Sequence, residues 1–476
     1  MKAVWDWKEH FEEIKDTDVF DCYIAEALLS EGRFNPSLES TLDAYHAKTL
    51  EELAEKQKTA LAKLPALEKL FYEIELPLVP VLFSMQTYGI ALDTKKLAQT
   101  GDEILIAMQK MREELLSDIG YEINLNSSQQ VGEYLAEKEG VPLGKTKTGK
   151  YATNESELLK FKDQFAIIQK LLDYRAFAKL HSTYVKSLID KVDKNGRVHT
   201  TYYQALVNTG RLASSSPNLQ NIPVTSDFGI KIKSCFTASP GTTFVSFDYS
   251  QQELRILAHL SGEEKLIEAF KQNQDVHILT AGQIFNVAPR DVTKIQRRVG
   301  KTINFGIIYG MSSYGLSESL QIPVPEAELF IKEFYTTFPK IKTYYDQYLA
   351  GAKTRGFVET ILGRRRFVFE DPKRRFIDNS TRRVLLNYPI QGSAADFIKL
   401  AMVKINDSVL KNNNDIHLLL QIHDDLVFEI KNNGKQQEYI AAIYEIMCTV
   451  YPLAVPIEVD VKTGRNWGDM ILLTEK

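Results

Sequence analysis

The sequence of 476 residues contains no apolar run long enough to cross a membrane as a helix. Its most apolar stretches, such as residues 76–83, fall well short of the ~20 residues that a membrane-spanning helix needs. Cysteine is scarce, and the three cysteines, Cys22, Cys235 and Cys448, form neither a disulfide framework nor a CxxC metal motif. Residues 1–7 lack the apolar core of a secretory signal. These absences favour a cytoplasmic protein without structural disulfides.

The sequence also lacks an excess of positive charge. It has 58 Lys and Arg against 62 Asp and Glu, a net charge of −4. Because nucleic-acid-binding proteins are often strongly basic, the sum argues against a nucleic-acid partner. Basic residues nevertheless cluster locally, at residues 145–147, 364–366 and 373–375. The hydrophobic fraction of 44% is that of a globular protein, and the length is enough for roughly three domains.

No internal repeat recurs along the chain, which excludes a solenoid or propeller. Residues 1–76 are predicted to form short amphipathic helices. In the apolar stretch that follows, Pro77 and Pro80 argue against a long uninterrupted helix and indicate a junction between domains. Residues 93–190 are rich in predicted helix. The Lys- and Gly-rich segment 144–153 within them is either a solvated loop or a phosphate-contacting segment.

The predicted secondary structure changes after residue 190. Residues 241–249 are β-branched and aromatic, which predicts a strand, and residues 251–353 are predicted to be largely helical. Two further strands, at 416–423 and 426–430, flank a tight turn and predict a β-hairpin. This order predicts a sheet-based domain into which a helical domain is inserted.

Carboxylates occur at the predicted strand ends. Asp248 ends the first strand, and Asp424 and Asp425 lie at the tip of the hairpin. Carboxylates brought together by a sheet repel each other unless a hard divalent cation bridges them, and Mg²⁺ prefers one or two carboxylates completed by water and phosphate. The alternative for Asp424 and Asp425 is an ordinary polar turn.

A predicted helix carries cations and aromatic rings in order. Arg297, Lys301, Phe305 and Tyr309 recur every four residues and therefore form one slowly winding stripe roughly 18 Å long. A triphosphate requires cations, and a base or sugar requires aromatic surface. The stripe predicts a nucleotide site; the alternative is an amphipathic helix with a charged start and a buried aromatic end.

Three segments together resemble the motifs of family A DNA polymerases, the bacterial DNA polymerase I group. They are residues 248–255, 297–310 and 421–425, and further matches follow at 209–215, 217–223, 275–277, 362–366 and 387–396. The resemblance implies an α+β fold with right-hand polymerase architecture: an antiparallel palm sheet with helical fingers and thumb. The implied domains are a partial, inactive 3′–5′ exonuclease-like domain at 1–76, the thumb at 77–190, the palm at 191–254 and 381–476, and the fingers at 255–380.

The resemblance further implies a template-directed DNA polymerase that adds deoxynucleotides to a primer 3′-OH with two Mg²⁺ ions and without proofreading. The implied metal ligands are Asp248, Asp424 and the Tyr249 carbonyl, and Asp425 and Lys301 are also expected to be catalytic. The implied nucleotide-binding residues are Gln251, Glu253, His277, Arg297, Lys301, Phe305 and Tyr309. The implied primer- and template-binding residues are Arg211, Asn218, Gln220, Asn221, Arg383, Asn387, Gln391 and His423. The implied partners are primer-template DNA and deoxynucleoside triphosphates but no membrane, for a monomer in a bacterial nucleoid or phage-infected cell.

By the same resemblance, Glu253, one helical turn beyond Asp248, is expected to close the space beside the sugar 2′ position and so to disfavour ribonucleotides. Several residues depart from the family pattern. Asp425 replaces the usual Glu of the His-Asp-Glu motif, and Thr225 stands where Arg is common. Arg382 replaces a frequent Glu, and Tyr388 replaces a frequent small residue.

Residues 20–30 resemble the later half of the family's 3′–5′ exonuclease domain. The Asp-x-Glu-Thr and Tyr-x-x-x-Asp motifs of that domain are not found before the junction. We therefore expect residues 1–76 to be a structural remnant or the cut end of a longer protein, with Asp6 and Asp21 as surface or capping residues.

Two alternatives stand beside the DNA polymerase. One is a catalytically weak nucleic-acid-binding relative, against which the intact Asp248 and Asp424 argue. The other is a single-subunit RNA polymerase, which shares a similar helix and carboxylate pair; Glu253 and Phe305 favour deoxynucleotides instead.

Overall fold

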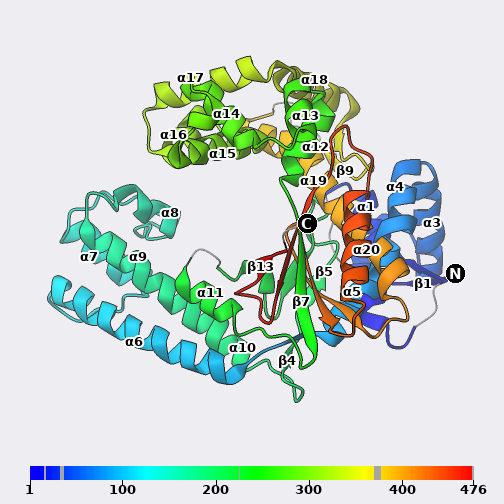
Figure 1. The fold of residues 1–476 in the computed structure, drawn as a ribbon, viewed down its shortest axis with the longest axis horizontal. Helices are drawn as coiled ribbons and strands as arrows, with labels where there is room; N and C mark the ends of the chain where they lie inside the picture. Colours follow the sequence, from blue (N-terminus) through cyan, green and yellow to red (C-terminus); the bar gives the residue numbers. More distant parts are fainter. Residues whose placement is uncertain (15–17, 33–36, 224–225, 369–376, 474–476) are drawn as a thin grey trace.

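The structure is a computed structural model that describes residues 1–14, 18–32, 37–223, 226–368 and 377–473. Thr225 and the basic segment 373–375 lie outside the described residues. Figure 1 shows a central sheet with a helical lobe above it, a helical arm extending to one side and a group of N-terminal helices on the other.

The central sheet is antiparallel throughout, with strand order β10-β11-β7-β12-β13. The middle strand β7 (Thr242–Tyr249) buries Phe244, Val245 and Phe247 completely, which explains its position at the centre. The hairpin of β10 (Ile416–Ile422) and β11 (Asp425–Lys431) turns at residues 423–424, as the sequence predicts. The remaining strands of the sheet are β12 (Val459–Gly464) and β13 (Ile471–Leu472).

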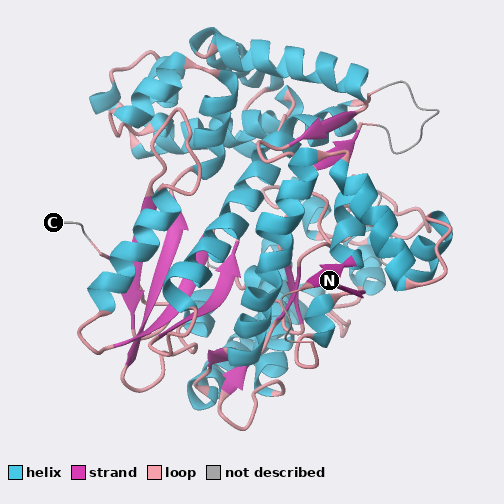
Figure 2. Cartoon of the chain, turned by 90° about the vertical axis from the view of Figure 1, so that its right-hand side faces the viewer, coloured by secondary structure: helices cyan, strands magenta, loops and turns pink. Residues whose placement is uncertain are grey.

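The lobe above the sheet is largely helical, with one short strand pair (Figure 2). In chain order it is inserted between β7 and the hairpin, as the sequence predicts. Its long closing helix, α19 (Asn379–Ile405), descends from the lobe to the sheet region and packs against α20 (Gln436–Cys448). The other elements are α12 (Gln252–Ser261), α13 (Glu264–Lys271), α14 (Val276–Phe285), α15 (Lys294–Ile308), α16 (Ser313–Leu320), α17 (Val324–Thr337), α18 (Pro339–Arg355), β8 (Phe357–Glu359) and β9 (Arg365–Phe367).

The side arm is built mainly from the 26-residue helix α6 (Thr94–Ile119), which packs along α9 (Ala166–Lys179). The Lys- and Gly-rich segment 144–153 forms a mostly exposed loop in this arm. The arm's other helices are α7 (Ser128–Glu137), α8 (Glu155–Leu158) and α10 (Ser187–Ile189). Between arm and sheet lie α11 (Asp227–Lys233) and the strand pairs β3 (Ile90–Ala91) with β4 (Arg197–Val198) and β5 (Thr201–Tyr203) with β6 (Ala213–Ser215).

The N-terminal region combines short helices with a parallel strand pair that the sequence did not predict. The strands are β1 (Lys2–Val4) and β2 (Val19–Asp21), and Asp21 ends the pair as the cap of α1 (Cys22–Leu29). The fully buried Asp21 carboxylate accepts hydrogen bonds from the backbone N–H groups of three residues. The capping role expected of Asp21 is confirmed, whereas its alternative as a surface residue is wrong. The remaining helices are α2 (Leu38–Ala44), α3 (Leu50–Ala62) and α4 (Pro65–Leu70).

The expectation that Pro77 and Pro80 prevent a long helix is wrong. Helix α4 continues through a π-helical turn at Phe71–Glu75 into α5 (Leu76–Tyr88) without a break. The Leu76 N–H donates to the Phe71 carbonyl. Because this turn is wider than an α-helical turn, the helix continues past Pro77, which has no backbone N–H to donate. Gly89, with φ +65°, then ends the helix.

Among the residues that the structure describes, no helix combines the length and the apolar character needed to span a membrane.

Candidate active site

The three carboxylates predicted at strand ends come together at one end of the sheet. Asp248 of β7 and Asp425 of β11 are direct register partners, and Asp424 precedes Asp425 in the hairpin turn. The Tyr249 N–H donates to the Asp424 carbonyl at 3.2 Å, which ties the end of β7 to the turn. The pairing of Asp248 with the hairpin tip is thus present in the fold.

Burial makes ionisation of these carboxylates costly. It raises the pKa of Asp248 to about 6, and the charge of Asp424 adds to the effect. Burial likewise raises the pKa of Asp424 and that of Asp425 to about 6, with Asp248 contributing at Asp425. The Ser246 hydroxyl donates to Asp425 at 2.8 Å and offsets part of this shift in the pKa of Asp425. Such a group is stabilised by a cation.

A cavity of about 40 Å³ opens beside Asp424, and four further predicted site residues line it. The Arg211 guanidinium donates to the Glu253 carboxylate at 2.7 Å across this cavity. The second oxygen of Glu253 is buried, and the Tyr309 hydroxyl also interacts with this carboxylate. The lining residues that the sequence predicts are Arg211, Gln220, Glu253, His423 and Asp424. The neighbouring Gln251 adopts φ +52° at the start of α12, and its amide oxygen is also buried and unpaired.

The residues near the hairpin that are predicted to contact nucleic acid differ in their hydrogen bonds and in their exposure. Gln220 donates to the Gln421 side chain at 3.0 Å, which links it to the hairpin. Asn218 caps a short helical turn, and Asn221 is exposed. His423 adopts φ +56° in the hairpin turn and is exposed. Gln220 and His423 therefore line the cavity beside Asp424, while Asn218 and Asn221 flank Gln220 on the surface.

The stripe of cations and aromatic rings forms on α15 as the sequence predicts. A capping box between Thr293 and Gln296 starts the helix. The Lys301 ammonium lies 5.8 Å from the Phe305 ring centre, and the Phe305 and Tyr309 rings lie 6.2 Å apart. Burial raises the pKa of Tyr309, and the charges of Glu253 and Asp424 contribute. The C-terminal end of the stripe therefore reaches the carboxylates.

Helix α14 places His277 against this stripe, 5.9 Å from the Phe305 ring. Gly300 permits the contact, because a Cβ there would stand 2.4 Å from the His277 carbonyl. Asn304 accepts from Thr280 through its oxygen, so its NH₂ group donates to Nδ1 of His277 at 2.9 Å. Nδ1 is thus an acceptor, and Nε2 carries the proton of the neutral ring. Burial lowers the pKa of His277 to about 4, so the ring is a neutral hydrogen-bond donor at pH 7.

Arg297 has a carboxylate partner in this structure. Its Nε donates to Asp275 at 2.7 Å, and both side chains are partly exposed. Partly exposed pairs of this kind contribute little stability, so the guanidinium can exchange this partner for an anionic ligand at small cost.

A second stripe lies on α19, where Arg383, Asn387 and Gln391 recur every four residues. The turn after α15 packs against its start, since a Cβ at Gly310 would lie 3.0 Å from the Arg383 side chain. The Asn387 amide oxygen is buried without a partner. Tyr388, the large residue at a usually small position, is fully buried and donates to the Arg365 carbonyl at 2.9 Å. Tyr388 therefore fills the core beneath the β8–β9 hairpin.

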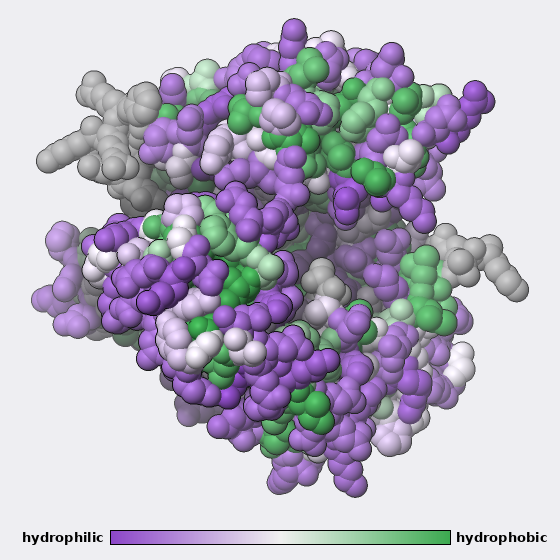
Figure 3. Space-filling view, turned by 90° about the vertical axis from the view of Figure 1, so that its left-hand side faces the viewer, coloured by the Kyte–Doolittle hydropathy of each residue, from purple (hydrophilic) through white to green (hydrophobic). Residues whose placement is uncertain are grey.

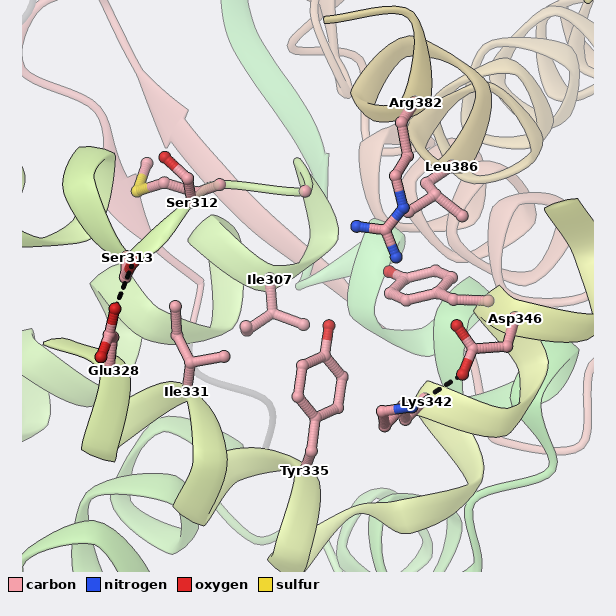
Figure 4. Close-up of a pocket in the computed structure, with 13 residues that line it drawn as sticks. Ile307, Ser312, Ser313, Glu328, Ile331, Tyr335, Lys342, Asp346, Arg382 and Leu386 are labelled. Atoms are coloured by element: carbon pink, nitrogen blue, oxygen red, sulfur yellow. Dashed lines mark hydrogen bonds and ion pairs between the residues drawn. The ribbon is translucent and has the colours of Figure 1, made fainter. Parts of the chain in front are cut away.

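A larger cavity of about 370 Å³ lies within the lobe (Figure 4). Arg382, the residue that replaces a frequent Glu, projects into it from α19 beside Leu386, with Tyr335 facing them from α17. This cavity adjoins the end of α15 and does not include the carboxylates. Seen from the arm side, the surface is hollowed between the lobe and the lower part of the molecule (Figure 3).

Several residues near the carboxylates were not singled out from the sequence. They are Ser246, Lys233, Lys462 and Asp460. The alternation of residues 459–462 places Asp460 and Lys462 on one face of β12, which is the signal that would have found them.

A sheet with clustered carboxylates below a lobe whose helix bears cations and aromatic rings defines the class of nucleic-acid polymerases with palm, fingers and thumb. Comparison with known sequences identifies the family within this class. The profile of DNA polymerase family A matches residues 94–469, and the chain belongs to this family.

Individual relatives agree with this assignment. The chain is 41% identical over 436 residues to the thermostable DNA polymerase I of Thermus caldophilus, covering 90% of this chain and 52% of that protein. It is 40% identical over 406 residues to DNA polymerase I of Geobacillus stearothermophilus, covering 84% of this chain and 46% of that protein. The chain therefore spans about half the length of the curated relatives it matches.

A solved structure is similar over nearly the whole fold. It is the POL domain of Pol1 from M. smegmatis in complex with DNA primer-template and dNTP. The TM-score is 0.87 at 34% sequence identity, covering 94% of this chain and 82% of the solved chain. The expected α+β right-hand polymerase architecture is confirmed.

Proposed function

We propose that the chain is a template-directed DNA polymerase that adds deoxynucleotides to the 3′-OH of a primer. The observation that carries the proposal is the convergence of Asp248, Asp424 and Glu253 with the end of the α15 stripe at Tyr309. Family membership supports the same activity. The proposed partners are primer-template DNA and deoxynucleoside triphosphates, with the protein acting as a monomer.

We assign two Mg²⁺ ions to Asp248, Asp424 and the Tyr249 carbonyl. The fit rests on two clustered carboxylates whose pKa values are raised by burial and by neighbouring negative charges. No three His, Cys, Asp or Glu side chains among the described residues form a metal cluster by themselves, so water and phosphate would complete the coordination, as Mg²⁺ prefers. When bound, the ions would activate the primer hydroxyl and neutralise charge on the leaving pyrophosphate. Asp425, turned toward Ser246, supports the pair from beside it.

The α15 stripe is proposed to bind the incoming nucleotide. Arg297 and Lys301 provide charge for the triphosphate, and neutral His277 donates from Nε2. The Phe305 and Tyr309 rings offer apolar surface to the sugar and the nascent base pair. Holding the triphosphate and the primer terminus in line supplies much of the rate of such a transfer. Gln251, beside Asp248, completes the proposed nucleotide site.

Glu253 is proposed to exclude ribonucleotides. Arg211 holds its carboxylate at 2.7 Å, and the rest of the group is buried. A 2′-hydroxyl entering this space would meet a fixed carboxylate, which penalises ribose more than deoxyribose.

The stripe on α19 and the amides beside the hairpin are proposed to hold primer and template. Arginine and amide side chains suit phosphate and minor-groove acceptors, which are largely independent of sequence. The proposed DNA-binding residues are Arg211, Asn218, Gln220, Asn221, Arg383, Asn387, Gln391 and His423. In domain terms, we assign the thumb to 77–190, the palm to 191–254 and 381–476, and the fingers to 255–380.

We propose that residues 1–76 supply no 3′–5′ exonuclease activity, so that nucleotide addition by this chain proceeds without proofreading. Asp21 supports this, because its carboxylate is engaged by backbone N–H groups and is buried away from any substrate. A mismatched, labelled primer end that persists without nucleotides would agree, and its removal would contradict the proposal.

Primer extension tests the proposed activity. We expect extension of a primed DNA template with Mg²⁺ and deoxynucleotides, and poor extension with ribonucleotides. Asp248→Ala should lose at least ~10³-fold in rate while retaining primer-template binding in a gel-shift assay. Asp407→Ala, which removes an exposed carboxylate from another part of the chain, is the matched control. Absence of extension by the unmodified chain would favour a binding protein, and preferential use of ribonucleotides would favour an RNA polymerase.

A further inference from the structure

Three neighbouring strands place carboxylates in one row across the central sheet. Asp425 of β11, Asp248 of β7 and Asp460 of β12 are direct register partners. Directly paired residues of antiparallel strands point to the same face of a sheet, so the three carboxylates share one face. Two residues further along the strands, Ser246 and Lys462 are partners on this same face. The carboxylate row is therefore followed by a row that holds a hydroxyl and an ammonium group.

Lys462 is placed diagonally to the centre of the carboxylate row. Its Nζ lies 3.9 Å from Oδ2 of Asp248. The Lys462 side chain is 40% exposed and that of Asp248 is 36% exposed. The ammonium is thus close enough to balance the charge of Asp248. Because the side chain is flexible and partly exposed, it can also turn toward solvent.

A second lysine acts on the same carboxylates. Lys233 of α11 lies over the Trp467 ring, 4.1 Å from the ring centre. Burial lowers the pKa of Lys233, while the charges of Asp425 and Asp248 act in the opposite direction. The ring contact fixes Lys233 in place, whereas Lys462 has no aromatic contact of this kind among the described residues.

We propose that Lys462 is a resident counter-ion of Asp248 that competes with divalent cations, and so sets the cation concentration that the site requires. This inference rests on the proposed function, in which Asp248 is a metal ligand. An ammonium and a divalent cation attract the same carboxylate oxygens but repel each other. Each ion that binds must therefore displace Lys462 toward solvent, which weakens binding without preventing it.

Binding of Mn²⁺ alone to the full chain, without DNA or nucleotide, tests the inference. Free Mn²⁺ is measured by electron paramagnetic resonance for the unmodified chain, Lys462→Met and Lys462→Arg. We expect Lys462→Met to lower the dissociation constant about two- to fivefold, the range for a partly exposed charge pair. Lys462→Arg should stay near the unmodified chain because it keeps the charge. Lys431→Met is the matched control, since Lys431 ends β11 and pairs with Asp415 at 2.9 Å instead.

An unchanged or higher dissociation constant for Lys462→Met would overturn the inference, as would an equal change in Lys431→Met. Asp248→Ala separates this outcome from failure of the proposed function. If Asp248→Ala leaves Mn²⁺ binding unchanged, the metal site itself is misassigned. If Asp248→Ala weakens binding and Lys462→Met has no effect, only the role of Lys462 is refuted.

Discussion

A buried ion network joins the N-terminal region to the sheet and the lobe, and its removal gives the sharpest prediction about stability. Glu75, in the π-helical turn, accepts from Lys399 of α19 at 2.8 Å and from Arg364. Arg364 also donates to Asp396 at 2.8 Å, and Gln204 donates to Glu75. The Lys399 and Asp396 side chains are fully buried. Because a buried charge without its partner is costly, we expect loss of Glu75 to destabilise the protein strongly.

The magnitude follows from the titration of Glu75. Burial alone would raise its pKa, but Lys399 and Arg364 outweigh burial and lower the pKa from 4.5 to about 2. At about 1.4 kcal/mol per pKa unit, the ionised form contributes about 3 kcal/mol at pH 7. Because the folded-state pKa lies below the unfolded one, this contribution is complete above pH 4.5 and is lost as the pH falls toward 2. At pH 3.5 about 2 kcal/mol should remain.

Urea unfolding of Glu75→Gln measures this contribution. Fluorescence of Trp5 and Trp7 reports on the N-terminal region, and circular dichroism reports on the helices. Glu73→Gln is the matched control, because Glu73 lies in the same helical turn but is 59% exposed and pairs with Lys69 at 3.7 Å. We expect Glu75→Gln to lose about 3 kcal/mol at pH 7 and less at pH 3.5, and Glu73→Gln to lose below about 0.5 kcal/mol. Equal effects of the two substitutions, or a loss at Glu75 that does not shrink on acidification, would refute the reasoning.

Three further predictions concern the candidate site. Glu253→Ala should raise the use of ribonucleotides relative to deoxynucleotides by about ten- to a hundredfold in single-nucleotide extension, and an unchanged ratio would contradict the proposed sugar gate. The His277 ring should titrate with a pKa of about 4 by nuclear magnetic resonance, and stability should fall as the pH drops from 6.5 toward 4, because only the unfolded chain takes up the proton there. A measured pKa of 6.5 or above would contradict the burial and the Asn304 contact. Gly300→Ala should destabilise the protein by about 1–3 kcal/mol through its clash with the His277 carbonyl, whereas Gly351→Ala in α18 meets only a flexible arginine and should be near neutral in thermal unfolding.

The features that the sequence predicts correctly are those with a local period. Strand β7 has a dense β-branched and aromatic run, and the hairpin has two apolar strands around Asp424. The α15 stripe needs only the four-residue spacing of Arg297 to Tyr309. In each case the residues that define the pattern are neighbours in sequence, so elementary geometry places them together.

The features that the sequence misses depend on contacts between distant segments. The strand pair β1–β2 joins three-residue strands whose partners lie 17 residues apart, too short for a periodic signal. The π-helical turn before Pro77 relies on i→i−5 hydrogen bonding, as from the Leu76 N–H to the Phe71 carbonyl, which leaves no signal in the amino-acid composition. The tautomer of His277 is fixed by Asn304 on another helix, and the position of Lys462 depends on the register of β12 against β7.

The net charge of −4 is a poor guide to binding partners, because the charged residues that bear on binding are grouped in local clusters of different sign. In the network around Glu75, two buried carboxylates balance two buried cations, so the set carries no net charge to a ligand. At the end of the sheet, Asp248, Asp424 and Asp425 form an acidic group that Lys462 and Lys233 compensate only in part, and we propose that this group binds cations. Lys301 lies on the helix whose far end reaches that group, and it presents the opposite sign. A ligand that carries both a phosphate chain and bound cations is complementary to these two surfaces together. The net charge of the chain does not reveal this complementarity.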